Sequence, residues 1–129
     1  VFEHFSFSEE GLVWLEVARV LRPGGRLTME VPDFEWVCQR FLAAQDEWRD
    51  FYIAGHPDHY AGCGRALDQR WGILQTMFFG NQNGTGQFHR CAYTEAKLRA
   101  LARILGFQAI AVEKRFSKGG QALRAILTR

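Results

Sequence analysis

The sequence has little cysteine, no concentrated positive charge and no long apolar run. Its three cysteines are widely spaced and form no C-x-x-C pair, which suits reduced thiols in a cytosol better than a disulfide framework. The net charge is only +2, without a Lys/Arg block, so no nucleic-acid partner is expected. No stretch approaches the roughly 20 apolar residues that span a bilayer, and the N-terminus lacks signal-peptide regions. We expect a cytoplasmic protein without a membrane partner.

The first third of the chain predicts a strand between two helices. Ser8 is expected to cap a helix that ends before a Pro-Gly-Gly turn. The expected apolar face of this helix is Val13, Val17, Val20 and Leu21. Residues 26–31 predict a strand that ends at Pro32 and Asp33, where Asp33 caps the second helix. The expected apolar face of the second helix is Val37, Cys38, Phe41 and Leu42.

The rest of the chain predicts an irregular insert, a third helix and a closing hairpin. The glycine-rich insert is expected to hold a short helix at about 67–78. Thr94 is expected to cap the third helix and Gly106 to end it. The expected apolar face of that helix is Leu98, Leu101, Ala102 and Leu105. Residues 107–116 and 121–129 predict an antiparallel hairpin. The element order predicts an α/β protein whose first strand lies in a sheet covered on both faces.

Two long motifs carry a family resemblance. The stretches "EHFSFSEEGLVWLEVARVLRPGGRLTMEVPDFEWV" and "FHRCAYTEAKLRALARILGF" resemble the C-terminal half of class I S-adenosylmethionine-dependent methyltransferases. The resemblance covers essentially the whole chain. It implies the C-terminal portion of a Rossmann-like methyltransferase sheet with a closing antiparallel hairpin. Residues 1–129 would then form a single partial domain with an irregular insert at about 55–90.

The chain departs from this family in its cofactor-binding motifs. It has neither the loop of the form G-x-G-x-G nor the acidic residue that would hold the ribose. In the family the strand at 26–31 would pair on one side with a strand ending where this chain begins, and on the other with the last strand. Half of that sheet is therefore expected to come from a longer protein or from a partner. The isolated chain is expected to bind S-adenosylmethionine weakly or not at all.

The resemblance implies transfer of a methyl group to a small polar acceptor. It implies a catalytic base at His4, because the Glu-His pair lies at the end of a strand where open α/β sheets bind ligands. The cofactor contacts implied are Glu3, His4 and Phe5, and those to the acceptor are Asn83, Gln87, His89, Arg90 and Tyr93. Glu3 and His4 could instead cap local backbone or pair with each other, and the polar loop could be a solvated turn. The alternative function is a noncatalytic, methyltransferase-like dimerisation or scaffolding module.

Two further expectations concern metals and self-association. The ligand-type residues considered are His56, Asp58, His59, Cys63, His89 and Cys91. Their spacing matches no closed structural zinc site, so no metal is expected. Apolar residues such as Trp14, Leu15 and Trp36 exceed what three strands would cover, and the strand at 26–31 would keep one free edge. We therefore expect a homodimer, unless a missing N-terminal half completes the sheet.

Overall fold

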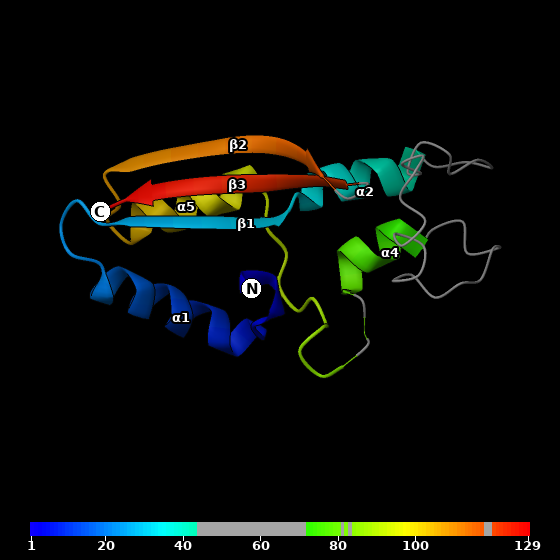
Figure 1. Cartoon of the computed structure of the whole chain (residues 1–129), viewed down its shortest axis with the longest axis horizontal. Coiled ribbons are helices and arrows are strands. Elements are labelled where there is room, and N and C mark those ends of the chain that lie inside the picture. Colours follow the sequence, from blue (N-terminus) through cyan, green and yellow to red (C-terminus); the bar gives the residue numbers. More distant parts are fainter. Residues whose placement is uncertain (44–71, 81, 83, 118–119) are drawn as a thin grey trace.

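The computed structural model describes residues 1–43, 72–80, 82, 84–117 and 120–129 as a mixed α/β unit (Figure 1). Its helices and strands are η1 (Phe2–His4), α1 (Phe7–Val20), β1 (Arg26–Pro32), α2 (Phe34–Ala43), α4 (Gly72–Phe79), α5 (Glu95–Ile104), β2 (Ala109–Ser117) and β3 (Gly120–Thr128). In this part of the chain no helix is long and apolar enough to cross a membrane. The predicted α/β class is confirmed at this coarse level.

The sheet has three antiparallel strands in the order β1-β3-β2. Ala125 at its centre lies opposite Met29 of β1 and Val112 of β2. This arrangement confirms both the closing hairpin and the pairing of the strand at 26–31 with the last strand. The other edge of β1 has no strand partner within the described ranges. A parallel, Rossmann-like sheet is therefore not what these residues form by themselves.

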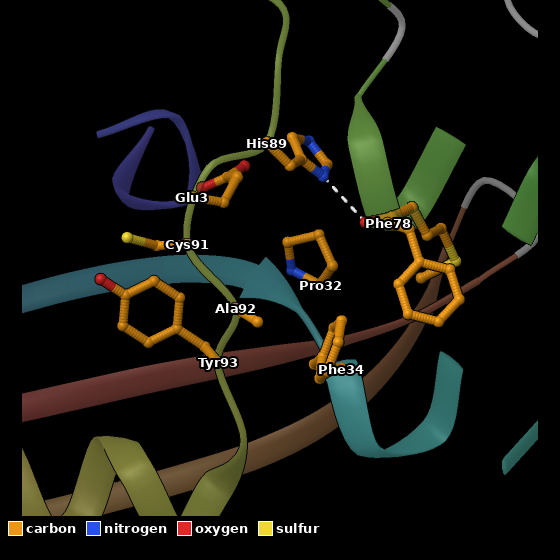
Figure 2. Close-up of a pocket in the computed structure, with 9 residues that line it drawn as sticks. Glu3, Pro32, Phe34, Phe78, His89, Cys91, Ala92 and Tyr93 are labelled. Atoms are coloured by element: carbon orange, nitrogen blue, oxygen red, sulfur yellow. Dashed lines mark hydrogen bonds between the residues drawn. The ribbon is translucent and has the colours of Figure 1, made fainter. Parts of the chain in front are cut away.

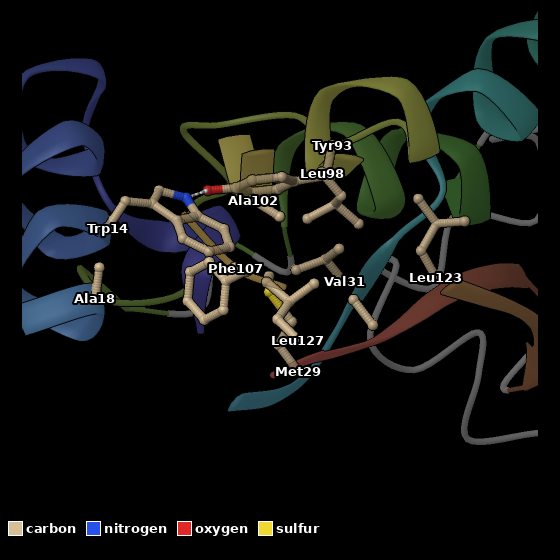
Figure 3. Close-up of a cluster of buried hydrophobic side chains, with 11 residues drawn as sticks. Trp14, Ala18, Met29, Val31, Tyr93, Leu98, Ala102, Phe107, Leu123 and Leu127 are labelled. Atoms are coloured by element: carbon tan, nitrogen blue, oxygen red, sulfur yellow. Dashed lines mark hydrogen bonds between the residues drawn. The ribbon is translucent and has the colours of Figure 1, made fainter. Parts of the chain in front are cut away.

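The helices cover one face of the sheet. Figure 3 shows side chains from α1, α5, β1 and β3 meeting in one buried cluster. Its members are Trp14, Ala18, Met29, Val31, Tyr93, Leu98, Ala102, Phe107, Leu123, Ala125 and Leu127. The opposite face carries exposed Thr28, Glu30 and Glu113. The expectation of cover on both faces is wrong for the described residues, because the strands alternate apolar and polar side chains as one-sided antiparallel sheets do.

Helix α1 begins earlier than predicted, and its predicted apolar face is correct only in part: Val17 and Leu21 pack against the core, but Trp14 and Ala18 are its buried residues. Its N-cap is Ser6, not Ser8, and Ser6 forms a capping box with Glu9. Trp14 is only 1% exposed, whereas Val20 is 60% exposed. At 100° per residue, Val20 lies about 120° around the helix from Trp14, while Ala18 lies only about 40° away. The expectation that Trp14 forms uncovered apolar surface for a dimer is therefore also wrong.

The other two predicted helices begin where the sequence indicates. Asp33 caps α2 through a hydrogen bond of 3.3 Å from Trp36 N–H, but Leu42 is 85% exposed because it lies about 140° around the helix from buried Val37. Thr94 accepts from Lys97 N–H and caps α5, and Gly106 ends it with φ of 77°. The short helix expected at 67–78 is observed as α4, and residues 67–71 lie outside the described part.

Candidate functional site

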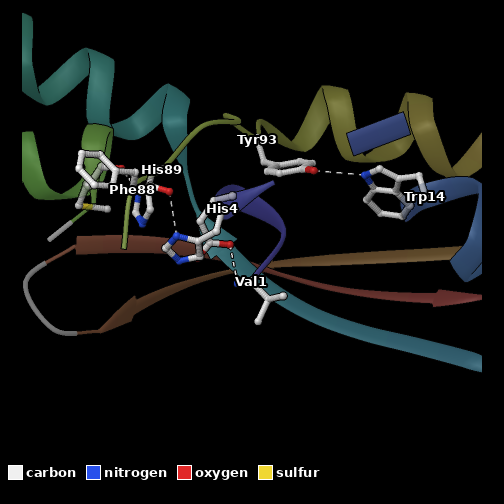
Figure 4. A network of polar contacts seen from close by, with 8 residues as sticks. Val1, His4, Trp14, Phe88, His89 and Tyr93 are labelled. Carbon is white, nitrogen blue, oxygen red and sulfur yellow. Dashed lines mark hydrogen bonds and ion pairs between the residues drawn. The ribbon is translucent and has the colours of Figure 1, made fainter. Parts of the chain in front are cut away.

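The candidate site forms where η1 meets the chain that follows α4. The carbonyl oxygen of Glu3 accepts hydrogen bonds from the backbone N–H of Arg90 (2.6 Å) and of Cys91 (3.1 Å). These bonds bring Glu3 and His4 beside His89, although the two segments lie far apart in the sequence. Figure 4 shows the result, with the rings of His4 and His89 next to each other. Backbone pairing, rather than side-chain packing, thus assembles the site.

The two histidine rings lie against each other, and each has a backbone carbonyl oxygen beside its Nδ1. Their ring centroids lie 4.9 Å apart in an edge-to-face arrangement. His4 Nδ1 lies 3.0 Å from the carbonyl oxygen of Phe88, and His89 Nδ1 lies 2.8 Å from that of Met77. A carbonyl oxygen only accepts, so each Nδ1 carries the proton in these bonds. In the neutral form each Nε2 therefore keeps a lone pair, and burial lowers the pKa of His89, which favours that form.

A small pocket adjoins the histidines at the C-terminal end of β1 (Figure 2). It is lined by Glu3, Pro32, Phe34, Met77, Phe78, His89, Cys91, Ala92 and Tyr93. It holds about one water molecule, which is far too little for S-adenosylmethionine. Burial raises the pKa of the Cys91 thiol, so this group stays protonated near neutral pH. The pocket is therefore a small, mainly apolar notch beside His89 and not a cofactor cleft.

The structure brings only some of the predicted site residues together. Glu3, His4 and His89 form one cluster, whereas Gln87 and Arg90 are exposed. Phe5 is partly buried and its ring packs edge-on against Phe2 at 6.2 Å. Asn83 lies outside the described residues, as do His56, Asp58, His59 and Cys63. Pro32, Met77 and Phe78, which sequence reasoning did not select, also line the pocket.

Tyr93 belongs to the core as well as to the pocket wall. Its hydroxyl accepts a hydrogen bond of 3.2 Å from Trp14 Nε1 and lies near the Glu10 carboxylate. Burial, and next the nearby Glu10 carboxylate, raise the pKa of Tyr93 far above its ordinary value. The hydroxyl therefore remains protonated at physiological pH, and it ties α1 to the start of α5.

Glu10 is held between Tyr93 and Lys97. Lys97 Nζ lies 2.6 Å from Glu10 Oε1 and 4.4 Å from the centre of the Tyr93 ring. Burial alone would raise the pKa of Glu10, but the ion pair with Lys97 and the nearby Tyr93 hydroxyl outweigh it and lower the pKa below its ordinary value. The ionised carboxylate is therefore more stable in the folded chain than in the unfolded one.

Glu10→Gln is expected to destabilise the fold in a pH-dependent way. Because the folded pKa is lowered, the stabilisation by Glu10 is present above the ordinary glutamate pKa and is lost as pH falls through the folded pKa. At pH 7 we expect a loss of about 1 kcal/mol in the free energy of unfolding, shrinking toward zero below about pH 4. Urea titrations at several pH values measure this, with Glu30→Gln on the exposed face of the sheet as the control variant. A loss that stays constant with pH would contradict the assignment.

Asp33 has a structural role at the end of β1. Its side chain is 1% exposed, its Oδ2 accepts a bond of 2.6 Å from Gln121 Nε2, and its Oδ1 accepts from Trp36 N–H. Both carboxylate oxygens are thus engaged in joining α2 to β3. The interpretation of Asp33 as a helix cap is confirmed.

No family model, curated protein or solved structure matches this chain. The resemblance to methyltransferases therefore rests on the two motifs alone.

Proposed function

We propose that the chain is the acceptor-side half of an S-adenosylmethionine-dependent methyltransferase domain, with His4 as general base. The observation that carries this proposal is that His89 lines a pocket with Pro32, at the C-terminal end of β1, and that the ring of His4 lies against the ring of His89. Ligands of open α/β sheets bind outside the carboxyl ends of the strands. The edge of β1 that has no strand partner among the described residues is also where the resemblance expects a further strand.

The pocket at the C-terminal end of β1 does not fit the cofactor. It admits about one water molecule, and the chain has no glycine-rich loop after a strand. In the proposed function the cofactor is therefore held by other residues, and this chain supplies acceptor contacts and a base. His4 suits that task because its Nδ1 proton is engaged by the Phe88 carbonyl, which leaves Nε2 free to take a proton from an acceptor hydroxyl or ammonium group.

The test begins with the gene. Codons upstream of Val1 that encode a strand followed by G-x-G-x-G would favour the enzyme over the scaffolding module. The protein expressed from the whole gene is then expected to bind S-adenosylmethionine in calorimetry. His4→Ala is expected to lower its turnover roughly 10²-fold or more with little change in thermal stability, while Gln108→Ala, at the opposite end of the sheet, leaves turnover unchanged. Absence of cofactor binding by that protein would refute the proposal.

A further inference from the structure

The cluster of Glu3, His4 and His89 offers a set of metal ligands. One ligand atom from each residue lies within 4.8 Å of those from the other two, and all three residues are partly buried. Two imidazoles and one carboxylate are a known ligand set of catalytic zinc sites, in which a fourth position stays open. The spacing of ligand-type residues along the chain does not reveal this set, because Glu3 and His4 lie far from His89 in the sequence.

The surroundings of the two rings are those of metal-binding histidines. Histidines that bind metals usually donate their other ring N–H to a backbone carbonyl or a carboxylate, which fixes the ring and presents the lone pair. Here His4 Nδ1 faces the Phe88 carbonyl at 3.0 Å and His89 Nδ1 faces that of Met77 at 2.8 Å. In both rings, therefore, Nδ1 is already hydrogen-bonded to a backbone carbonyl oxygen, and Nε2 is the nitrogen that would bind a metal ion. This second observation is independent of the proximity of the three residues.

The carboxylate completes the set with one oxygen. Glu3 Oε1 lies 3.6 Å from His4 Nε2. Ligand atoms around a tetrahedral zinc ion at about 2.0–2.1 Å lie roughly 3.4 Å apart. The Glu3 and His4 atoms already meet this spacing, and the widest separation of 4.8 Å in the cluster needs only a rotation of partly exposed side chains.

We propose that Glu3, His4 and His89 form a binding site for a divalent transition-metal ion, and that Zn²⁺ suits its donor set. The site keeps at least one coordination position open toward solvent or substrate. This inference does not rest on methyl transfer. An ion on His4 Nε2 would occupy the lone pair that a general base needs, so the metal-bound state and the base role exclude each other. Zinc binding is measured without any acceptor, and failure of one proposal leaves the other intact.

The experiment must separate this cluster from the ligand-type residues of the insert. All measurements therefore use the full chain carrying His56→Ala and His59→Ala, titrated with ZnCl2 in a calorimeter. We expect one equivalent of zinc to bind. Adding Glu3→Gln or His89→Ala to this background is expected to weaken binding at least about tenfold, while adding Gln108→Ala leaves it unchanged.

Glu3→Gln keeps the proposal testable even where His89→Ala perturbs folding. The backbone carbonyl of Glu3, which holds the segment at 90–91, is unaffected by this substitution, and circular dichroism verifies the fold. Zinc is also expected to raise the midpoint of thermal unfolding of the background chain and not that of its Glu3→Gln form. No zinc binding by the background chain, or equal affinity with and without Glu3→Gln, would overturn the assignment.

Discussion

Replacing Trp14 by alanine is expected to lower the free energy of unfolding by about 3–5 kcal/mol, the range for large aromatic residues in cores. The side chain is 1% exposed, its ring packs on Phe2 at 4.9 Å, and its Nε1 donates to the hydroxyl of Tyr93. The substitution leaves a cavity and removes a donor from a buried hydroxyl. Small domains have free energies of unfolding of only about 5–15 kcal/mol, so this substitution would remove a large part of the stability of the chain.

The neighbouring residue supplies the matched control. Leu15 lies in the same helix but is 59% exposed, and Leu15→Ala is expected to change the stability by less than about 0.5 kcal/mol. Urea unfolding followed by tryptophan fluorescence or circular dichroism measures both variants. Equal losses for the two would mean that α1 buries a different face from the one described here.

The second large effect is expected for Gly80→Ala. Gly80 has φ of +79° and closes an isolated bridge with Phe88. A β-carbon at this position would collide with the carbonyl oxygen of Gln87, and the left-handed conformation itself costs an alanine about 1–2 kcal/mol. We expect a total loss of about 2–4 kcal/mol, by unfolding of the turn or of the whole chain.

Gly84→Ala provides the comparison for this turn. A β-carbon on Gly84 meets nothing within 4 Å, and its backbone is not in the left-handed region. This variant is expected to stay within about 0.5 kcal/mol of the parent. Because His89 N–H donates to the Phe79 carbonyl at 3.0 Å, Gly80→Ala is also expected to weaken zinc binding. Nuclear magnetic resonance shifts of the His89 ring would report this movement, and an unshifted ring would show that the turn does not position it.

Local features of the fold were predictable because they depend on neighbouring residues. The cap at Thr94, the stop at Gly106 and the strand ending before Asp33 each follow from a side chain or a backbone preference within a few positions. The buried face of α1 was predicted only in part: Val17 and Leu21 do pack against the core, but the prediction left out Trp14, which is fully buried. Which apolar residues a helix buries depends on the partner surface, and that surface is formed by distant strands.

The candidate site could be predicted only in part. The motif resemblance selected Glu3, His4 and His89, but nothing in the sequence indicated that they meet. Their meeting depends on the backbone carbonyl of Glu3 accepting from Arg90 and Cys91, and backbone hydrogen bonds leave no characteristic side-chain pattern. Covariation of positions 4 and 89 among homologous sequences is the kind of signal that would have revealed the pair.

The strand order β1-β3-β2 also bears on how the chain folds during synthesis. β3 is the last of the three strands to leave the ribosome, yet it lies between the other two and pairs with both. Until β3 emerges, neither β1 nor β2 has a partner among the described strands, and their apolar side chains have no completed sheet to join. β1 therefore stays without these strand partners from its own emergence until β3 leaves the ribosome, the period in which a chaperone protects such a strand best.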